Sequence, residues 1–354
     1  MQINELLKKL SEASGVSGYE ADVRELVREE FSHYADEIRV DAMGSLIALK
    51  RGETAQQLPR HSIMLAGHMD EIGLLVTKLE KGFLRFSTVG GFDLRVLPGQ
   101  EVIVHGRRDL PGIIATRPPH VLTPEERERI TPLDQLFIDV GLPDDELAKW
   151  ARVGDVITLQ RQFTELAGNL VAGKAFDDRA AVVCIAHCLQ HLSTMKHTWD
   201  VYAVATVQEE VGLKGALTST FGLAPDIDIA IDVCHGNMLG VPEVDTVNVG
   251  GGPAIAFGPN IHPLMYSRLV ETANSYEISY QPDPTPGPSG TDAWAMQVTR
   301  EGIPTALVSI PLRYMHTTVE TLSLKDLERA GRLLALFIAS LNESFAQELG
   351  LKTG

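Results

Sequence analysis

Residues 201–216 read VYAVATVQEEVGLKGA, and this stretch decides the fold. The apolar run 201–207 is followed by two adjacent carboxylates, Glu209 and Glu210, and then by a glycine-containing stretch that leads into a helical pattern. A strand followed by a helix is the repeating unit of an α/β sheet. Open α/β sheets bind ligands beyond the carboxyl ends of their strands, where this glutamate pair falls. The stretch therefore predicts an α/β fold with a polar site at one edge of the sheet.

Other side chains of metal-ligand type also follow apolar, strand-like runs. They are His68 with Asp70, the pair Asp177–Asp178, Asp232 and His316. A lone carboxylate at a strand end is usually a helix cap or a surface charge, and a Glu–Glu pair commonly lies in a solvated helix start. Imidazoles and carboxylates gathered at one sheet edge are instead typical ligands of divalent metals. Five such clusters in one chain favour a two-metal hydrolase.

The residue types also suggest how such a site is built. Catalytic metal pairs lie about 3.5–4 Å apart and need a shared carboxylate, and we expect Asp177 to be that bridge. Asp70 follows His68 by two residues, on the same side of an extended chain, so it can accept the other ring N–H of that histidine. One of Glu209 and Glu210 binds metal, and its neighbour acts as general base. Because successive strand residues face opposite ways, both can reach the site only if the chain turns there.

A second group of metal-type side chains lies within one predicted helix: Cys184, His187, Cys188 and His191. Four ligands within two turns of a helix cannot surround a metal ion tetrahedrally. We therefore predict a buried cysteine stripe and a half-exposed histidine stripe, with no metal.

Composition limits the class of protein. The chain has 354 residues, a length at which two domains are expected, and 31 Lys+Arg against 47 Asp+Glu give a formal charge of −16. This acidity argues against nucleic acid and anionic membranes as partners. Three cysteines suit a reducing compartment. No signal peptide is visible and no run approaches the about 18 apolar residues of a membrane helix, so we expect a cytoplasmic protein.

The middle of the chain differs in character from its two ends. From about residue 72, glycine and proline punctuate short strands, which predicts a small all-β module over 72–166. The flanking segments 1–71 and 167–354 read as one discontinuous α/β domain. Within the module, the Pro- and charge-rich segment 117–131 is predicted to be a mobile loop.

The element pattern supports this division. Expected strands and helices are a hairpin at 38–41 and 46–49, strands at 63–66, 201–207, 227–231 and 305–310, and helices at 179–191, from about 213, at 263–275 and at 324–344.

Eight motifs in order along the chain carry a family resemblance. They are SGVSGYE (14–20), DAMGSL (41–46), GHMDEIG (67–73), GKAFDDRA (173–180), QEEVGLKGA (208–216), AIDV (230–233), GPSGTDA (287–293) and YMHTTVE (314–320). With these motifs the chain resembles the tetrahedral (TET) co-catalytic metallo-aminopeptidases, which include glutamyl-, leucyl- and lysyl-specific enzymes. The resemblance implies a three-layer, zinc-exopeptidase-like domain with a mixed central sheet, interrupted by a barrel- or PDZ-like β domain that mediates dimerisation.

The same resemblance implies a role for each candidate residue. His68 and Asp232 would hold one metal ion, Glu210 and His316 the other, and Asp177 would bridge them. Glu209 would be the general base, Asp70 would support His68, and the Asp177–Asp178 peptide bond would be cis.

Family membership further implies the reaction and the assembly. The expected function is release of N-terminal residues from short peptides by a metal-bridged water, with two divalent ions per subunit. Zinc or cobalt is expected, with manganese as an alternative. The expected assembly is a homodimer that builds a tetrahedral dodecamer.

Three other functions remain to be weighed against this one. A metal-dependent aminoacylase or deacetylase on a related fold would need an arginine that clamps a carboxylate. A metal-independent glycoside hydrolase would use two carboxylates but leaves His68 and His316 unexplained, and 6% aromatic residues offer few sugar-stacking platforms. A non-enzymatic cage would not need the full ligand set. Residues around 253–265 and 285–296 are expected to choose the N-terminal side chain.

Overall fold

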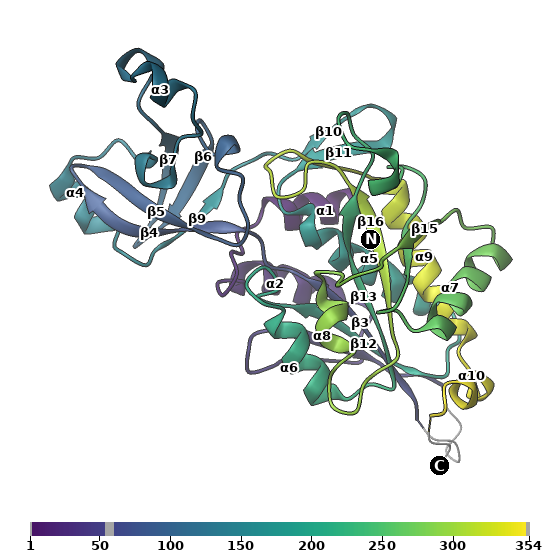
Figure 1. The fold of residues 1–354 in the computed structure, drawn as a ribbon. Helices are drawn as coiled ribbons and strands as arrows, with labels where there is room; N and C mark the ends of the chain where they lie inside the picture. Colours follow the sequence, from purple (N-terminus) through teal and green to yellow (C-terminus); the bar gives the residue numbers. More distant parts are fainter. Residues whose placement is uncertain (1, 54–59, 352–354) are drawn as a thin grey trace.

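The computed structural model describes residues 2–53 and 60–351. Residues 1, 54–59 and 352–354, which belong to the predicted ranges 1–71 and 167–354, lie outside the described part. An α/β part carries both ends of the described chain, and a β barrel projects from one side of it (Figure 1). The predicted fold class is thereby confirmed.

A mixed sheet of eight strands forms the centre of the α/β part. Its strands, in spatial order, are β1 (Glu37–Val40), β2 (Leu46–Lys50), β12 (Asp200–Thr206), β3 (Ser62–His68), β13 (Ile227–His235), β16 (Thr305–Leu312), β14 (Ala254–Phe257) and β15 (Gln281–Pro284). Strands β12, β3, β13 and β16 run parallel to one another, whereas β2 and β14 flank them antiparallel. Four parallel strands therefore end at the same edge.

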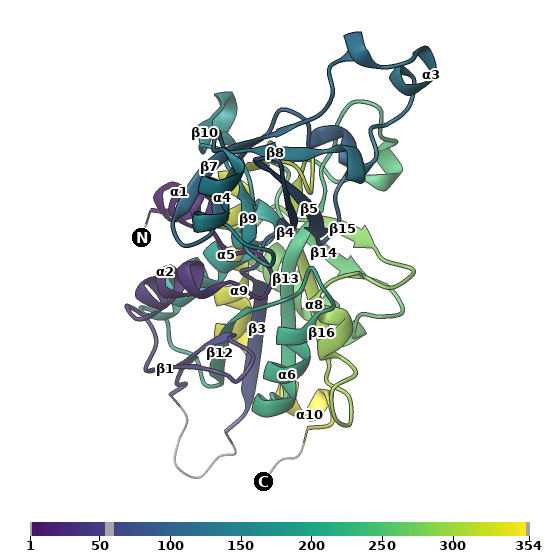
Figure 2. The ribbon, with the colours of Figure 1, turned by 90° about the vertical axis from the view of Figure 1, so that its left-hand side faces the viewer.

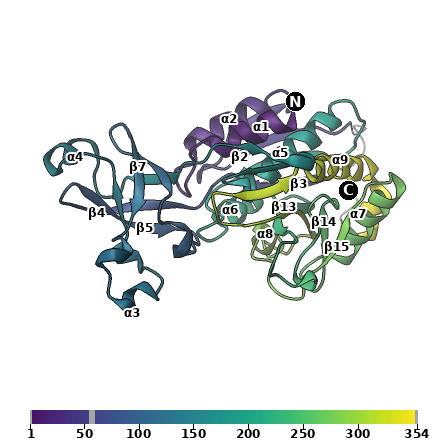
Figure 3. The ribbon, with the colours of Figure 1, turned by 90° about the horizontal axis from the view of Figure 1, so that it is seen from above.

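Helices cover both faces of this sheet and give three layers (Figure 3). One face carries α1 (Ile3–Glu12), α2 (Ala21–Phe31), α5 (Phe176–Leu192), α7 (Pro263–Ser275) and α9 (Leu324–Ser340), and the other carries α6 (Lys214–Leu223) and α8 (Asp292–Met296). The larger apolar core lies under the first set. Helix α5 is buried nearly all round between the sheet and α9, as expected from its apolar stretch at 180–186.

The inserted module is a closed antiparallel barrel, which faces the viewer in Figure 2. It consists of β4 (Gly73–Glu80), β5 (Phe83–Val89), β8 (Phe137–Asp139), β7 (Asp109–Ala115), β6 (Glu101–His105) and β9 (Val156–Leu159), with α4 (Asp144–Trp150) against it. These strands lie within the range predicted for the module, whose limits at 72 and 166 stay a prediction. Alternate residues of β7 are buried, which gives the barrel an apolar core of its own.

Three expectations about local structure are wrong in part. The segment 117–131 is not wholly irregular, because α3 (Pro124–Arg127) forms there behind a capping box of Thr123 and Glu126. The last helix does not reach 344: the chain is extended at Leu341, and Asn342 caps a separate helix α10 (Glu343–Glu348). Strand β13 continues past Asp232 to His235, because β16 keeps pairing with it.

A small second sheet was not expected. It joins β10 (Thr164–Glu165), β11 (Leu170–Gly173) and β17 (Glu320–Ser323). Leu170 pairs with Ser323, so this sheet brings the segment before Asp177 beside the segment after His316. None of the helices in the described residues has the length and apolar character needed to cross a membrane.

Candidate metal centre

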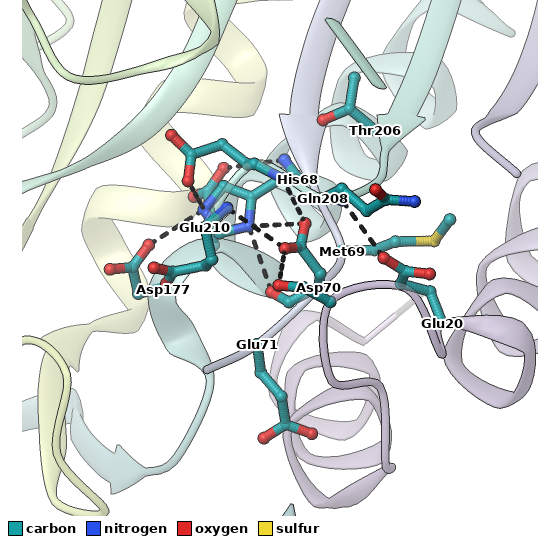
Figure 4. A network of polar contacts seen from close by, with 12 residues as sticks. Glu20, His68, Met69, Asp70, Glu71, Asp177, Thr206, Gln208 and Glu210 are labelled. Atoms are coloured by element: carbon teal, nitrogen blue, oxygen red, sulfur yellow. Dashed lines mark hydrogen bonds and ion pairs between the residues drawn. The ribbon is translucent and has the colours of Figure 1, made fainter. Parts of the chain in front are cut away.

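The site lies at the shared carboxyl edge of the parallel strands. His68 is the last residue of β3 and pairs in register with Thr206, the last residue of β12. Asp232 lies in the second half of β13, opposite Ser309 of β16. All seven predicted site residues come together at this edge, and Figure 4 shows the cluster around His68, Asp70, Asp177 and Glu210. The position matches the one expected of an open α/β sheet.

The glutamate pair enters the site because the chain turns. Strand β12 ends at Thr206, and Gln208 has a left-handed φ of 55°. After this turn the Oε2 of Glu209 lies 3.8 Å from His68 Nε2, and the Oε1 of Glu210 lies 3.3 Å from His316 Nε2. The condition that both side chains face the site only if the chain has turned is therefore met.

Asp177 lies between the two histidines. Its Oδ1 is 3.2 Å from His68 Nε2, and its Oδ2 is 3.3 Å from His316 Nε2. The peptide bond between Asp177 and Asp178 is cis, as the resemblance implies. One carboxylate thus offers one oxygen to each half of the site, which is the geometry needed of a bridging ligand.

The donor atoms fit divalent metal ions. Three groups have ligand atoms within 4.8 Å of one another: His68 with Glu209 and Glu210; His68 with Asp178 and Asp232; and Asp177 with Glu210 and His316. Mixed imidazole and carboxylate sets suit zinc and other first-row divalent metals. Asp178, the second member of the predicted aspartate pair, had no role of its own assigned, and its Oδ2 accepts the backbone N–H of His68 at 3.3 Å.

The charges in the site depend strongly on one another. Burial raises the pKa of Glu209 to about 10, and burial likewise raises the pKa of Asp232 well above its usual range. Hydrogen bonds with Asp177 and Glu210 raise the pKa of His316 to about 11. Burial opposes charging of His68, yet its bonds with Asp177 and Asp70 raise its pKa well above the ordinary value. The titration of each group is therefore tied to that of its neighbours, and metal binding at such a cluster would be linked to release of protons.

Asp70 organises both the histidine and the glutamate turn. Its Oδ1 lies 3.5 Å from His68 Nδ1, and its backbone carbonyl oxygen lies 3.1 Å from the same nitrogen. Its two carboxylate oxygens also accept the backbone N–H groups of Glu209 and Glu210, at 3.1 and 3.3 Å. The hydroxyl group of Ser17 donates a further hydrogen bond of 2.5 Å to Asp70 Oδ2. Although burial alone would raise its pKa, these bonds lower the pKa of Asp70 below the usual range.

Glu320 is a residue that the sequence analysis missed. It is buried, and its Oε2 accepts the backbone N–H groups of Phe176 and Asp177 at 2.7 and 3.2 Å. Its Oε1 accepts the N–H of His316 at 2.9 Å. One carboxylate therefore fixes the backbone of two candidate ligands. Its place four residues after His316 in YMHTTVE was visible, but its role depends on the unexpected β11–β17 pairing.

A buried ionic network lies behind the site. Glu71 Oε2 is 2.5 Å from Lys174 Nζ, and Glu71 Oε1 is 3.1 Å from Arg179 Nη2. Figure 4 shows the Glu71 side chain pointing away from the metal-site cluster. Arg179 also donates to the carbonyls of Leu10, Ala13 and Met69. These contacts fix the segments that flank Asp70 and Asp177.

The burial of the cysteine–histidine stripe in α5 is as predicted. Cys184 and Cys188 are fully buried in the core. His187 and His191 are half-buried, and their Nε2 atoms are 3.2 Å apart.

A cavity of about 1070 Å³ lies over the cluster. Its lining includes the candidate ligands His68, Asp177, Glu210, Asp232 and His316, and also the segments 233–235, 244–247, 257–259 and 282–291. Parts of both segments expected to choose the substrate side chain therefore line it. The walls at 233–235 and 244–247 were not anticipated, because no periodic pattern points to them.

Comparisons with known proteins agree with this architecture. The family model of the M42 glutamyl aminopeptidases matches residues 44–333. The lysyl aminopeptidase of Pyrococcus furiosus is 35% identical over 344 residues, 95% of this chain and 97% of that protein. A TET aminopeptidase structure from a marine-sediment Thaumarchaeota archaeon superposes with a TM-score of 0.92 at 34% identity, over 98% of this chain and 99% of the other.

A third relative, the TET1 peptidase of Pyrococcus horikoshii, superposes with a TM-score of 0.84 at 33% identity, over 96% of this chain and all (100%) of that one. A histidine–carboxylate cluster at the edge of such a sheet suits a metal-dependent hydrolase, and these relatives place the chain in the class of peptidases. Within that class, the chain belongs to the M42 glutamyl aminopeptidase family, as the resemblance predicted. It is therefore an aminopeptidase, a hydrolase of peptide bonds.

Proposed function

We propose that this aminopeptidase works with two divalent metal ions per subunit, zinc or cobalt, with manganese as an alternative. His68 and Asp232 would hold one ion, Glu210 and His316 the other, and Asp177 would bridge them. The observation that carries this proposal is the pair of contacts from the two Asp177 oxygens to the two histidines, at 3.2 and 3.3 Å. When bound, such ions supply Lewis acidity and lower the pKa of a water molecule.

The protein groups would then handle the protons. Glu209 would accept a proton from the attacking water and deliver it to the nitrogen of the leaving peptide. Bound dications would lower the pKa of Glu209 from the high value it has in their absence, so that it can act as a base. Asp70 would hold His68 and the 209–210 turn in place through the bonds described above.

The cavity lining disfavours the rival functions. None of the described lining residues is an arginine or lysine, whereas an aminoacylase or deacetylase needs a carboxylate clamp. Phe257 is the single Phe, Tyr or Trp among those residues, which is poor provision for a sugar chain. Two histidines within the carboxylate cluster also remain unexplained by metal-independent glycoside hydrolysis.

We also propose that the barrel mediates dimerisation and that dimers build a tetrahedral dodecamer. The TET1 peptidase of Pyrococcus horikoshii is described as assembling into a tetrahedron or a large octahedral shell. Exposed apolar side chains on and around the barrel, among them Ile113, Val121 and Ile130, would be covered in such an assembly.

The test is metal-dependent release of amino acids from aminoacyl-p-nitroanilides, with an N-acetylated substrate as control. Metal-free protein should be inactive, and added cobalt or zinc should restore cleavage of the free-amine substrates alone. Cleavage of the acetylated substrate alone would instead indicate a deacylase. Cleavage of neither substrate by the metal-loaded protein would contradict the proposed function.

A further inference from the structure

The cavity over the metal centre carries two carboxylates that the proposed chemistry does not use, Asp283 and Asp245. Asp283 belongs to β15 at the edge of the main sheet, and Asp245 to the exposed segment 243–245. Among the described lining residues, none is Lys or Arg, and His235 is the one histidine besides His68 and His316. The wall beyond the metal ligands is therefore acidic and lacks a counter-charge.

Asp283 is the more informative of the two. It is half-buried, and its carboxylate has no hydrogen bond or ion pair within residues 2–53 and 60–351. Other buried acids nearby are paired: Asp292 accepts the hydroxyl of Thr206 at 2.5 Å, and Asp326 accepts the N–H groups of Gly250 and Gly252 at 2.6 and 2.8 Å. Burial without a partner raises the pKa of Asp283. A half-buried carboxylate without a partner is stabilised more than a paired one by a cation that enters the cavity.

The position of Asp283 suits the end of a long side chain. Strand β15 lies three strands from β13, which carries Asp232, or about 14 Å at about 4.8 Å per strand. The lining of the same cavity also includes apolar groups, among them Phe257 and Leu307. Lysine and arginine have apolar stems that pack on such surfaces and charged ends that reach beyond them.

We propose that Asp283 selects substrates whose N-terminal residue is lysine or arginine. This inference rests on the proposed function, since the free α-amine must be held at the metal centre for the side chain to reach Asp283. An acidic N-terminal side chain would meet Asp283 and Asp245, with no Lys or Arg among the described lining residues to pair with it. A short apolar side chain would leave Asp283 unpaired.

The experiment compares kcat/KM for lysyl-, leucyl- and glutamyl-p-nitroanilide in the metal-loaded, full-length protein. The wild type should prefer lysyl over leucyl and cleave glutamyl least. Asp283→Asn should lower the lysyl-to-leucyl ratio by about tenfold, as expected for loss of a partly desolvated charge pair. Asp283→Lys should move the preference towards glutamyl. The exposed Asp145→Asn in α4, outside the cavity, is the matched control and should leave the ratio unchanged.

Dipeptides separate the N-terminal pocket from the next one. Lys-Leu should be cleaved faster than Leu-Lys by the wild type, and Asp283→Asn should reduce this difference. A preference for lysine only in the second position, or an unchanged ratio in Asp283→Asn with normal metal content, would overturn the inference and leave the aminopeptidase function intact. Failure to cleave any free-amine substrate would contradict the proposed function itself.

Discussion

The carboxyl edge of the main sheet and the inserted barrel use opposite means of stabilisation. The barrel closes around apolar side chains such as Leu84, Ile114 and Ile138. The sheet edge instead buries carboxylates and histidines that are satisfied mainly by one another, with Asp70 and Glu320 accepting backbone N–H groups. Buried charge is costly unless it is paired, so its concentration in one region marks the place where the fold serves chemistry rather than stability.

The largest expected effect is on turnover at the sheet edge. Glu209→Gln keeps the size of the side chain but cannot accept a proton, so kcat should fall by about 10²–10⁴-fold. Metal content, measured on the same samples, should remain that of the wild type. Near-wild-type turnover would show that another group is the base.

Substitutions in the barrel core should lower the stability of the protein without changing its turnover. Ile138 is fully buried between its neighbours in β5 and β7, so Ile138→Ala should lower the free energy of unfolding by about 2–5 kcal/mol. Denaturant unfolding measures this change, and kcat per folded molecule should be preserved. The exposed Glu101→Ala on β6 of the same barrel is the control and should change the stability of the chain by less than about 0.5 kcal/mol. Equal losses from the two variants would contradict the assignment of an independent barrel core.

Glu320→Gln tests whether a residue that is not a candidate metal ligand positions the backbone of two candidate ligands, Asp177 and His316. The amide would present an N–H₂ group to backbone N–H groups that now donate to a carboxylate, so metal affinity should fall by about 10–100-fold. Calorimetric titration of the metal-free protein gives the affinity, and the exposed Glu301→Gln serves as control. Unchanged affinity would indicate that β11 and β17 hold the ligands without Glu320.

A smaller, pH-dependent effect is expected at Asp228, at the other end of β13. Burial raises the pKa of Asp228 well above its usual range, and Thr305 offsets only part of this. The folded state then binds more protons than the unfolded state above about pH 4, so this residue's contribution to stability falls as pH rises. Asp228→Asn should match the wild type near pH 4 and be more stable by about 1–3 kcal/mol at pH 7. Unfolding measured at several pH values should give this divergence, and parallel curves would refute it.

Local patterns were sufficient to predict most strands and helices and the side chains that gather at the sheet edge. The runs at 63–66, 201–207 and 305–310 each lie within or largely overlap a strand of the main sheet, and helix 263–275 has the predicted limits. The sequence indicated which side chains meet at the sheet edge because imidazoles and carboxylates rarely follow apolar runs, and their role as metal ligands stays a proposal.

What could not be predicted depends on contacts between distant segments. The pairing of Leu170 with Ser323, which gives Glu320 its role, leaves no periodic signal in either segment. The cavity wall at 244–247 is likewise visible only after folding. The extension of β13 past Asp232 depends on pairing with β16, and no local sequence pattern in either strand predicts this extension.

The most direct test of the account is a cobalt titration of the metal-free protein, with cleavage of an aminoacyl-p-nitroanilide followed at each addition. The account predicts that activity rises with metal and reaches its maximum at two ions per chain. Full activity without added metal, or a maximum at one ion per chain, would contradict a two-metal centre bridged by Asp177.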